Sequence, residues 1–160
     1  MIKKCEIIPI EFVVRNVASG SICSRLGIKD GLKLKKPLLE YYLKEDSLDD
    51  PIVSRDHLEL FGWATKKEIE KIDRMSLKIN HCLINHFKKK GITLVDFKIE
   101  FGRLSSNKKK IVLADEISPD SCRLWDSKSK TKLDKDVFRK GLGNLIDAYE
   151  EVASRLGIVH

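Results

Sequence analysis

Three ionisable residues, Asp96, Lys98 and Glu100, alternate with apolar residues in the segment 94–102. Successive side chains of an extended strand point to opposite faces, so this period of two predicts a strand with one apolar and one charged face. An acid, a base and a second acid in line could bind a metal ion, a phosphate group or a carboxylated substrate. They could equally form a ladder of surface charges that compensate one another, and the segment alone leaves both interpretations open.

A further acid, Asp115, lies on the segment 110–117, which we expect to pair with 93–103 as a hairpin because a polar turn separates them. If Glu100 and Asp115 project from the same face, two carboxylates converge. Such oxygen ligands suit Mg²⁺, which commonly takes one or two protein carboxylates and completes its shell with water and phosphate. Lys98 could then hold a substrate anion and keep the acids ionised.

Arg15 lies at the end of the first expected strand, within the β-rich segment 5–17. A turn of small residues that contains Gly20 and Ser21 follows this segment. Such a turn lets backbone N–H groups and a hydroxyl approach an anion, and a nearby guanidinium would complete the grip on a phosphate or carboxylate. The alternative is an ordinary turn.

Arg123 lies in the polar loop 115–126, beside Trp125. This loop could form the wall of a site and supply Arg123 to an anion, or it could be a capped turn in which the Trp125 indole is packed. Lys135 and Arg139 are four residues apart and would share one face of a helix that begins at Asp134. They are either surface cations or a second anion clamp.

The clearest helix begins at Thr65, an N-cap whose capping box is completed by Glu68, and it ends at Gly91. We also expect a short helix at 22–26 and irregular structure over 28–57.

The pattern predicts a final helix from Asp134 or Asp136 to Gly157, with Leu142 in its apolar stripe. Helices are thus mixed with antiparallel strands. We expect the α+β class, an antiparallel sheet with flanking helices.

The composition is that of a single domain of 160 residues, with 42% apolar and 34% charged residues and a net charge of +7. The chain has no long apolar run and no hydrophobic signal core, so we expect no membrane span. Four scattered cysteines without a CxxC pair indicate reduced thiols and a cytoplasmic protein. The lysine runs at 88–90 and 108–110 fall at expected turns without a nucleic-acid motif, so we expect no nucleic-acid partner.

Four blocks of the chain together resemble the SAICAR synthetase family in both order and spacing. They are residues 7–21, 94–102, 114–126 and 133–139. The resemblance covers nearly the whole chain. It implies an ATP-dependent ligase of purine biosynthesis that uses Mg²⁺ and joins L-aspartate to carboxyaminoimidazole ribonucleotide (CAIR). In this reaction ATP phosphorylates the CAIR carboxylate, and the amine of aspartate displaces phosphate.

The resemblance also implies roles for individual residues. Glu100 and Asp115 match positions that face Mg²⁺ and the ATP phosphates, and Asp96 and Lys98 match catalytic positions near the ribose and carboxylate of the ribonucleotide. The expected substrate-binding residues are Arg15, Ser21, Arg123, Lys135 and Arg139.

Family members begin with an N-terminal lobe that carries a glycine-containing, lysine-bearing loop over ATP, and this chain starts just before the first matching block. We therefore expect 1–160 to form one SAICAR synthetase-like domain without that lobe. Exposed apolar sheet surface would favour association into a homo-oligomer such as a dimer. Three functions are alternatives to the CAIR ligase. The chain could be a catalytically incomplete fragment, a basic nucleotide- or RNA-binding domain, or an ATP-dependent ligase that acts on a different carboxylate.

Overall fold

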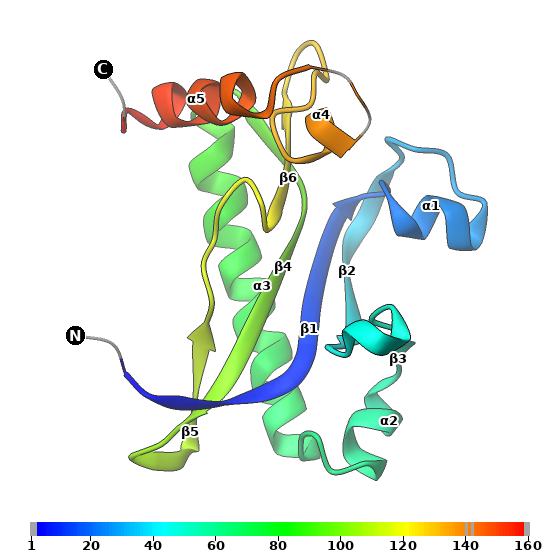
Figure 1. Cartoon of the computed structure of the whole chain (residues 1–160), viewed down its shortest axis with the longest axis vertical. Coiled ribbons are helices and arrows are strands. Elements are labelled where there is room, and N and C mark those ends of the chain that lie inside the picture. Colours follow the sequence, from blue (N-terminus) through cyan, green and yellow to red (C-terminus); the bar gives the residue numbers. More distant parts are fainter. Residues whose placement is uncertain (1–2, 140, 142, 159–160) are drawn as a thin grey trace.

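A computed structural model describes residues 3–139, 141 and 143–158, and it contains one six-stranded antiparallel sheet with helices around it (Figure 1). The strand order is β3-β2-β1-β4-β5, and β6 pairs with β4 beyond the end of β5. This arrangement confirms the α+β class. The elements are β1 (Cys5–Val17), α1 (Ser21–Leu26), β2 (Lys33–Leu43), the 3₁₀ helix η1 (Asp46–Leu48), β3 (Ile52–Val53), α2 (Arg55–Leu60), α3 (Lys66–Lys88), β4 (Ile92–Leu104), β5 (Asn107–Ala114), β6 (Cys122–Asp126), α4 (Asp136–Arg139) and α5 (Leu145–Leu156).

The hydrophobic core lies between the sheet and α3, which runs along one face of β4 (Figure 1). Phe12 on β1 and Phe101 on β4 meet edge to face, with ring centroids 5.4 Å apart. The apolar side of α3 contributes Ile69 and Ile72 to the same core. Because α3 covers this face, the opposite face of the central strands is left for polar side chains.

The ends of α3 follow the sequence prediction. The Thr65 backbone N–H donates to Glu68 Oε2 at 2.8 Å, and the Thr65 side chain accepts from the Glu68 N–H, which completes the capping box. Gly91 has a φ of 69°, a conformation that glycine adopts without a steric penalty, and it turns the chain into β4. The short helix α1 likewise ends at Gly27, as predicted.

The expectation of irregular structure over 28–57 is wrong, because this segment contains β2, η1, β3 and the start of α2. The sequence of β2 does not predict a strand, because it contains several lysines and Pro37 and has no regular alternation of apolar and polar residues. One of its two neighbours in the sheet is only the two-residue strand β3. Pro37 lies where the β1–β2 register shifts, between the pairs Arg15–Leu38 and Val17–Lys33, so a missing N–H is tolerated there. Pairing with β1, rather than local pattern, determines this strand.

The prediction of a single final helix is also wrong, because the chain forms α4 and α5 with a break between them. Gly141 lies in the break with a φ of 61°, and Asn144 caps α5 by accepting from the Ile146 N–H at 3.0 Å. Asp134 does not cap a long helix; its carboxylate accepts from the N–H groups of Leu124 and Asp136. The predicted stripe residue Leu142 lies outside the described residues.

The apolar face of β4 is interrupted at Val95. A shift in the β4–β6 register between Leu94 and Asp96 places Val95 in a small cluster with Val17 and Trp125, apart from the main core. The strict alternation expected over this strand therefore holds only from Asp96 onward, because a bulge adds one residue.

No helix among the described residues is long and apolar enough to cross a membrane. All four cysteines are free thiols.

Candidate functional site

The charged residues of β4 share a polar sheet face with residues of β1. The register places Asp96 opposite Arg15, and Glu100 opposite Glu11. Lys98 lies between the two pairs, and its Nζ is 2.5 Å from Glu11 Oε1. The three ionisable residues of β4 thus lie on one face, as the sequence predicts, and this face is opposite to the one that α3 covers.

The centre of this face is a buried carboxylate held by two arginines. Asp96 Oδ2 accepts from Arg15 Nη1 at 2.7 Å and from Arg123 Nη1 at 2.9 Å. Burial raises the pKa of Asp96, and the two guanidinium groups oppose that change. Arg123 also donates through Nε to Asp136 at 3.2 Å, which links the sheet to α4.

The other side of Arg15 contacts the first helix and β2. Arg15 Nε donates to Glu40 Oε2 at 2.6 Å, and Arg15 Nη2 donates to Ser21 Oγ at 3.1 Å. Glu40 also accepts from Arg25 Nη2 and from the Tyr42 hydroxyl. Arg15 is only 2% exposed. Its guanidinium is therefore occupied by protein groups and orients Ser21 and Asp96.

Sequence reasoning missed Glu40, Tyr42 and Arg25. Glu40 and Tyr42 lie on β2, in the segment expected to be irregular, so no pattern placed them beside Arg15. An isolated buried acid in the apolar run 37–43 was the signal that could have found Glu40, because a buried carboxylate needs a partner.

Gly20 makes room for Arg123. A Cβ atom at position 20 would lie 2.5 Å from Arg123 Nη2, and the backbone φ of 67° is one that other residues rarely adopt. The turn of small residues therefore accommodates the Arg123 guanidinium at Gly20 and presents the Ser21 hydroxyl to Arg15.

The far end of the polar face is acidic. Glu100 Oε1 accepts from Lys44 Nζ at 2.6 Å and is 5% exposed. Asp115 follows β5 with a φ of 67° and is exposed, so it does not continue the alternation of that strand. The pKa of Lys44 is raised by its hydrogen bond to Glu100 and further by the charges of Glu11 and Asp115, while burial opposes the change. Three carboxylates thus act on one ammonium group.

A set of three or more metal-ligating side chains does not occur in the part of the chain that the structure describes. The smaller set that Mg²⁺ commonly takes, one or two carboxylates, is present in Glu100 and Asp115. These residues fit a hard cation such as Mg²⁺. The Lys44 ammonium already lies among them, so their position suits a positive charge. Glu11 was missed as a member of this cluster because the sequence alone does not give the β1–β4 register.

A cationic region adjoins the acidic end. Lys135 lies 3.7 Å from Asp120, and its pKa is lowered, first by burial and then by the charges of Arg139, Lys98 and Arg123. The fold therefore brings four of the predicted cations near one another: Lys98 on β4, Arg123 on β6, Arg139 on α4, and Lys135 just before α4. Arg139 is exposed and makes no ion pair with any described residue.

The arrangement suits the binding of anions better than attack by a protein nucleophile. Burial raises the pKa of the Cys122 thiol to about 12, so this cysteine stays protonated and unreactive. Cations beside acids can instead neutralise negatively charged reactants and hold a metal ion against them. Fold and site together define an α+β protein with a face of paired acids and cations on an open antiparallel sheet.

Comparison with known proteins gives the family. The chain matches SAICAR synthetase over residues 1–156, and it belongs to this family. It is 62% identical to the phosphoribosylaminoimidazole-succinocarboxamide synthase of Pelagibacter ubique over 161 residues, covering all of this chain and 62% of that protein. The protein of the same name from Magnetococcus marinus is 54% identical, with 99% of this chain and 65% of that protein covered.

Solved structures agree. The phosphoribosylaminoimidazole-succinocarboxamide synthase of Ehrlichia chaffeensis superposes with a TM-score of 0.96 at 50% identity, over 99% of this chain and 68% of that one. A SAICAR synthetase in complex with ADP gives 0.91 at 48% identity, over 96% and 64%. The chain spans less than two thirds of the length of the curated relatives named above.

Proposed function

We propose that this chain carries the ribonucleotide-binding part of an ATP-dependent ligase that joins L-aspartate to CAIR, giving SAICAR, ADP and phosphate. The observation that carries the proposal is the shared polar face, where the cations Lys98, Arg123 and Lys135 adjoin the acids Glu100 and Asp115. A cationic and an acidic region side by side match a reaction between two anionic reactants and a metal-bound nucleotide.

The chemistry requires alignment and charge neutralisation more than acid–base catalysis. The carboxylate of CAIR attacks the terminal phosphorus of ATP, which forms an acyl phosphate and releases ADP. The neutral amine of aspartate then attacks the acyl carbon, phosphate leaves, and one proton is lost from nitrogen. Since each step brings negatively charged groups together, fixed cations and dipoles lower the barrier.

Cationic and hydroxyl groups would hold the ribonucleotide. Lys98 is partly exposed while its ammonium contacts Glu11, so it can also reach a substrate carboxylate. Asp96 fixes Arg123 for contact with an anionic group, and Arg15 positions Ser21 for the same purpose. Lys135 and Arg139 extend the cationic region across the start of α4.

Glu100 and Asp115 would hold Mg²⁺, which supplies positive charge to the nucleotide phosphates when it is bound. Mg²⁺ would compete with Lys44 for these carboxylates, so we propose that the lysine offsets part of the negative charge at the acidic end until the metal nucleotide binds. The expected cytoplasmic location and homo-oligomeric state stay predictions.

Calorimetric titration with CAIR tests the proposal on the chain as it is. We expect saturable binding that Lys135→Ala weakens at least about fivefold, since a partly buried cation is lost from the anion site. Lys36→Ala is the matched control, because Lys36 is an exposed lysine of β2 outside the site. Absence of CAIR binding in the parent chain would reject the proposal.

A basic domain that binds RNA is the second candidate, favoured by the net charge of +7. Filter binding to RNA separates the two functions. RNA binding at physiological salt, together with no heat from CAIR, would favour this candidate. Binding of CAIR without any ligation of aspartate would identify the chain as a catalytically incomplete part.

A further inference from the structure

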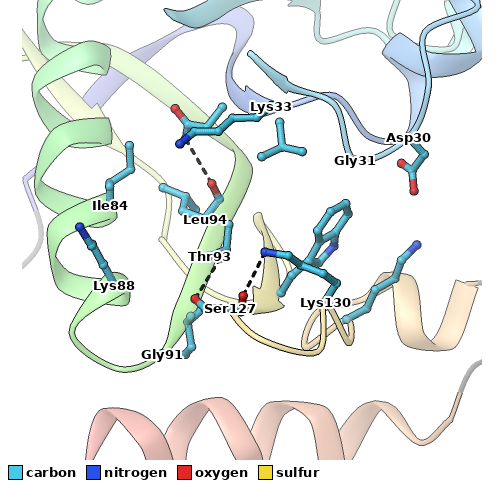
Figure 2. A pocket seen from close by; sticks show the side chains of 15 residues that line it. Asp30, Gly31, Lys33, Ile84, Lys88, Gly91, Thr93, Leu94, Ser127 and Lys130 are labelled. Carbon is cyan, nitrogen blue, oxygen red and sulfur yellow. Dashed lines mark hydrogen bonds between the residues drawn. The ribbon is translucent and has the colours of Figure 1, made fainter. Parts of the chain in front are cut away.

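A cavity of about 820 Å³ opens at the other end of the sheet, where β1 separates from β4 (Figure 2). The β1–β4 ladder ends at the pair Arg15–Asp96, and beyond it the Asn16 side chain donates to the Leu94 carbonyl at 3.4 Å. The lining residues are Asn16, Val17, Asp30, Gly31, Lys33, Ile84, Lys88, Gly91, Ile92, Thr93, Leu94, Trp125, Ser127, Lys130 and Lys132. None of the residues assigned above to CAIR, ATP or Mg²⁺ lines this cavity.

The rim of the cavity is strongly cationic. Four lysines line it against a single acid, Asp30. Figure 2 shows Lys33, Lys88 and Lys130 on three different elements, namely β2, the end of α3 and the turn after β6. Lys33 and Lys88 make no ion pair with any described residue, so their charges are available to a ligand. Lys130 donates to the Ser127 carbonyl at 3.0 Å, which holds its ammonium at the rim.

The floor of the cavity is apolar, with isolated polar groups. Ile92 and Leu94 are buried parts of the β4 core. Trp125 is 6% exposed, and its indole N–H is buried without an acceptor among the described residues. The Thr93 and Ser127 hydroxyl oxygens lie 3.0 Å apart and form a polar pair near the start of β4.

We propose that this cavity is a second ligand site, which binds a small organic anion that combines an apolar ring with a phosphate or carboxylate group. The lysines would bind the anionic group and the β4 floor would bind the ring. The volume lies within the range of roughly 300–1,000 Å³ that is usual for small-molecule sites and is sufficient for a nucleoside monophosphate. The inference does not depend on the ligase activity, because it uses different residues.

Tryptophan fluorescence provides a local test, because the chain has only two tryptophans and one of them lines the cavity. Trp63→Phe leaves Trp125 as the single fluorophore. We expect AMP to change its emission in a saturable way. Adenosine and inorganic phosphate, each of which has only half of the required chemistry, should bind at least about tenfold more weakly.

Charge-reversed variants locate the ligand. In the Trp63→Phe background, Lys33→Glu and Lys88→Glu should each weaken AMP binding about tenfold, because an attractive charge becomes repulsive. Lys78→Glu is the matched control, since Lys78 is an exposed lysine of α3 outside the cavity, and it should bind AMP like the parent. These side chains are exposed, so all three variants should keep the parent unfolding temperature.

A variant of the candidate ligase site separates the two sites. Lys98→Ala should leave the Trp125 response to AMP unchanged. The inference is overturned if AMP gives no saturable response, if the response survives both rim variants, or if Lys98→Ala abolishes it, since the last result would place AMP on the polar face instead.

Discussion

Glu11 and Glu100 lie directly opposite each other on neighbouring strands, and each carboxylate contacts a different lysine. Two acids in this relation repel each other, and the Lys98 and Lys44 ammonium groups offset that repulsion. The two ion pairs keep both carboxylates on the polar face, and we propose that a bound cation would take the place of the Lys44 ammonium beside Glu100.

Loss of the Glu100 carboxylate should weaken metal binding. We expect Glu100→Gln to lower Mg²⁺ affinity at least about tenfold in calorimetric titrations with ADP present, because an oxygen ligand loses its charge. Asp115→Asn should act in the same direction. Glu6→Gln serves as the control, because Glu6 is an exposed acid near the start of β1 that pairs with Arg103 and Lys108 instead. Unchanged Mg²⁺ affinity in both site variants would remove the metal assignment.

The carboxylate of Asp96 should be important for stability. Asp96→Asn leaves two arginines, Arg15 and Arg123, beside a neutral amide, and one of them is almost fully buried. Removal of one partner from a buried ion pair costs about 3 kcal/mol or more, which urea unfolding would measure. Asp120→Asn changes an exposed acid nearby and should cost less than about 0.5 kcal/mol. Equal stability of the two variants would contradict this assignment.

A methyl group at position 20 should displace the Arg123 guanidinium. Gly20 and Gly27 have similar φ angles, 67° and 63°, but ψ is −134° at Gly20 and 25°, in the left-handed region, at Gly27, so alanine is strained more at Gly20. Only at Gly20 would the new Cβ collide with a side chain. We therefore expect Gly20→Ala to lose CAIR affinity in calorimetry while Gly27→Ala keeps it. The same affinity in both variants would show that Arg123 does not need this contact.

Acid should destabilise the junction between α3 and β4 through Glu68. Its carboxylate accepts a hydrogen bond from Arg103 at 2.7 Å, which is the main cause that lowers its pKa from 4.5 to about 2. Because the folded-state pKa is below the unfolded one, the stabilisation is complete above about pH 4.5 and is lost as the pH falls toward 2.

Unfolding experiments between pH 2 and pH 6 measure this contribution. After allowance for solvent screening, Glu68→Gln should cost about 1 kcal/mol near neutral pH, and the difference from the parent should vanish near pH 2. The control is Glu59→Gln, an exposed acid of α2 without an ion pair among the described residues. A constant difference between Glu68→Gln and the parent across this range would exclude the ion pair as the cause.

Local signals predicted several elements well. The capping box of Thr65 and Glu68 marks the start of α3, and the glycines at 27, 91 and 157 mark helix ends and a turn, because these features depend only on neighbouring residues. The alternation from Asp96 to Glu100 likewise predicted the charged face of β4. The strand β2 and the break between α4 and α5 were missed, since one depends on pairing with β1 and the other on a cap at Asn144 that competes with a longer helix.

The sequence by itself determined which residues carry charge, where α1 and α3 form and which strand presents its ionisable groups on one face. Only the tertiary structure decided their partners: Glu40 beside Arg15, Glu11 beside Glu100, and three cations around Lys135. The reason is physical, because strand register and the packing of distant segments depend on contacts across the whole sheet. A local pattern specifies the face of a strand, but it does not specify what lies opposite.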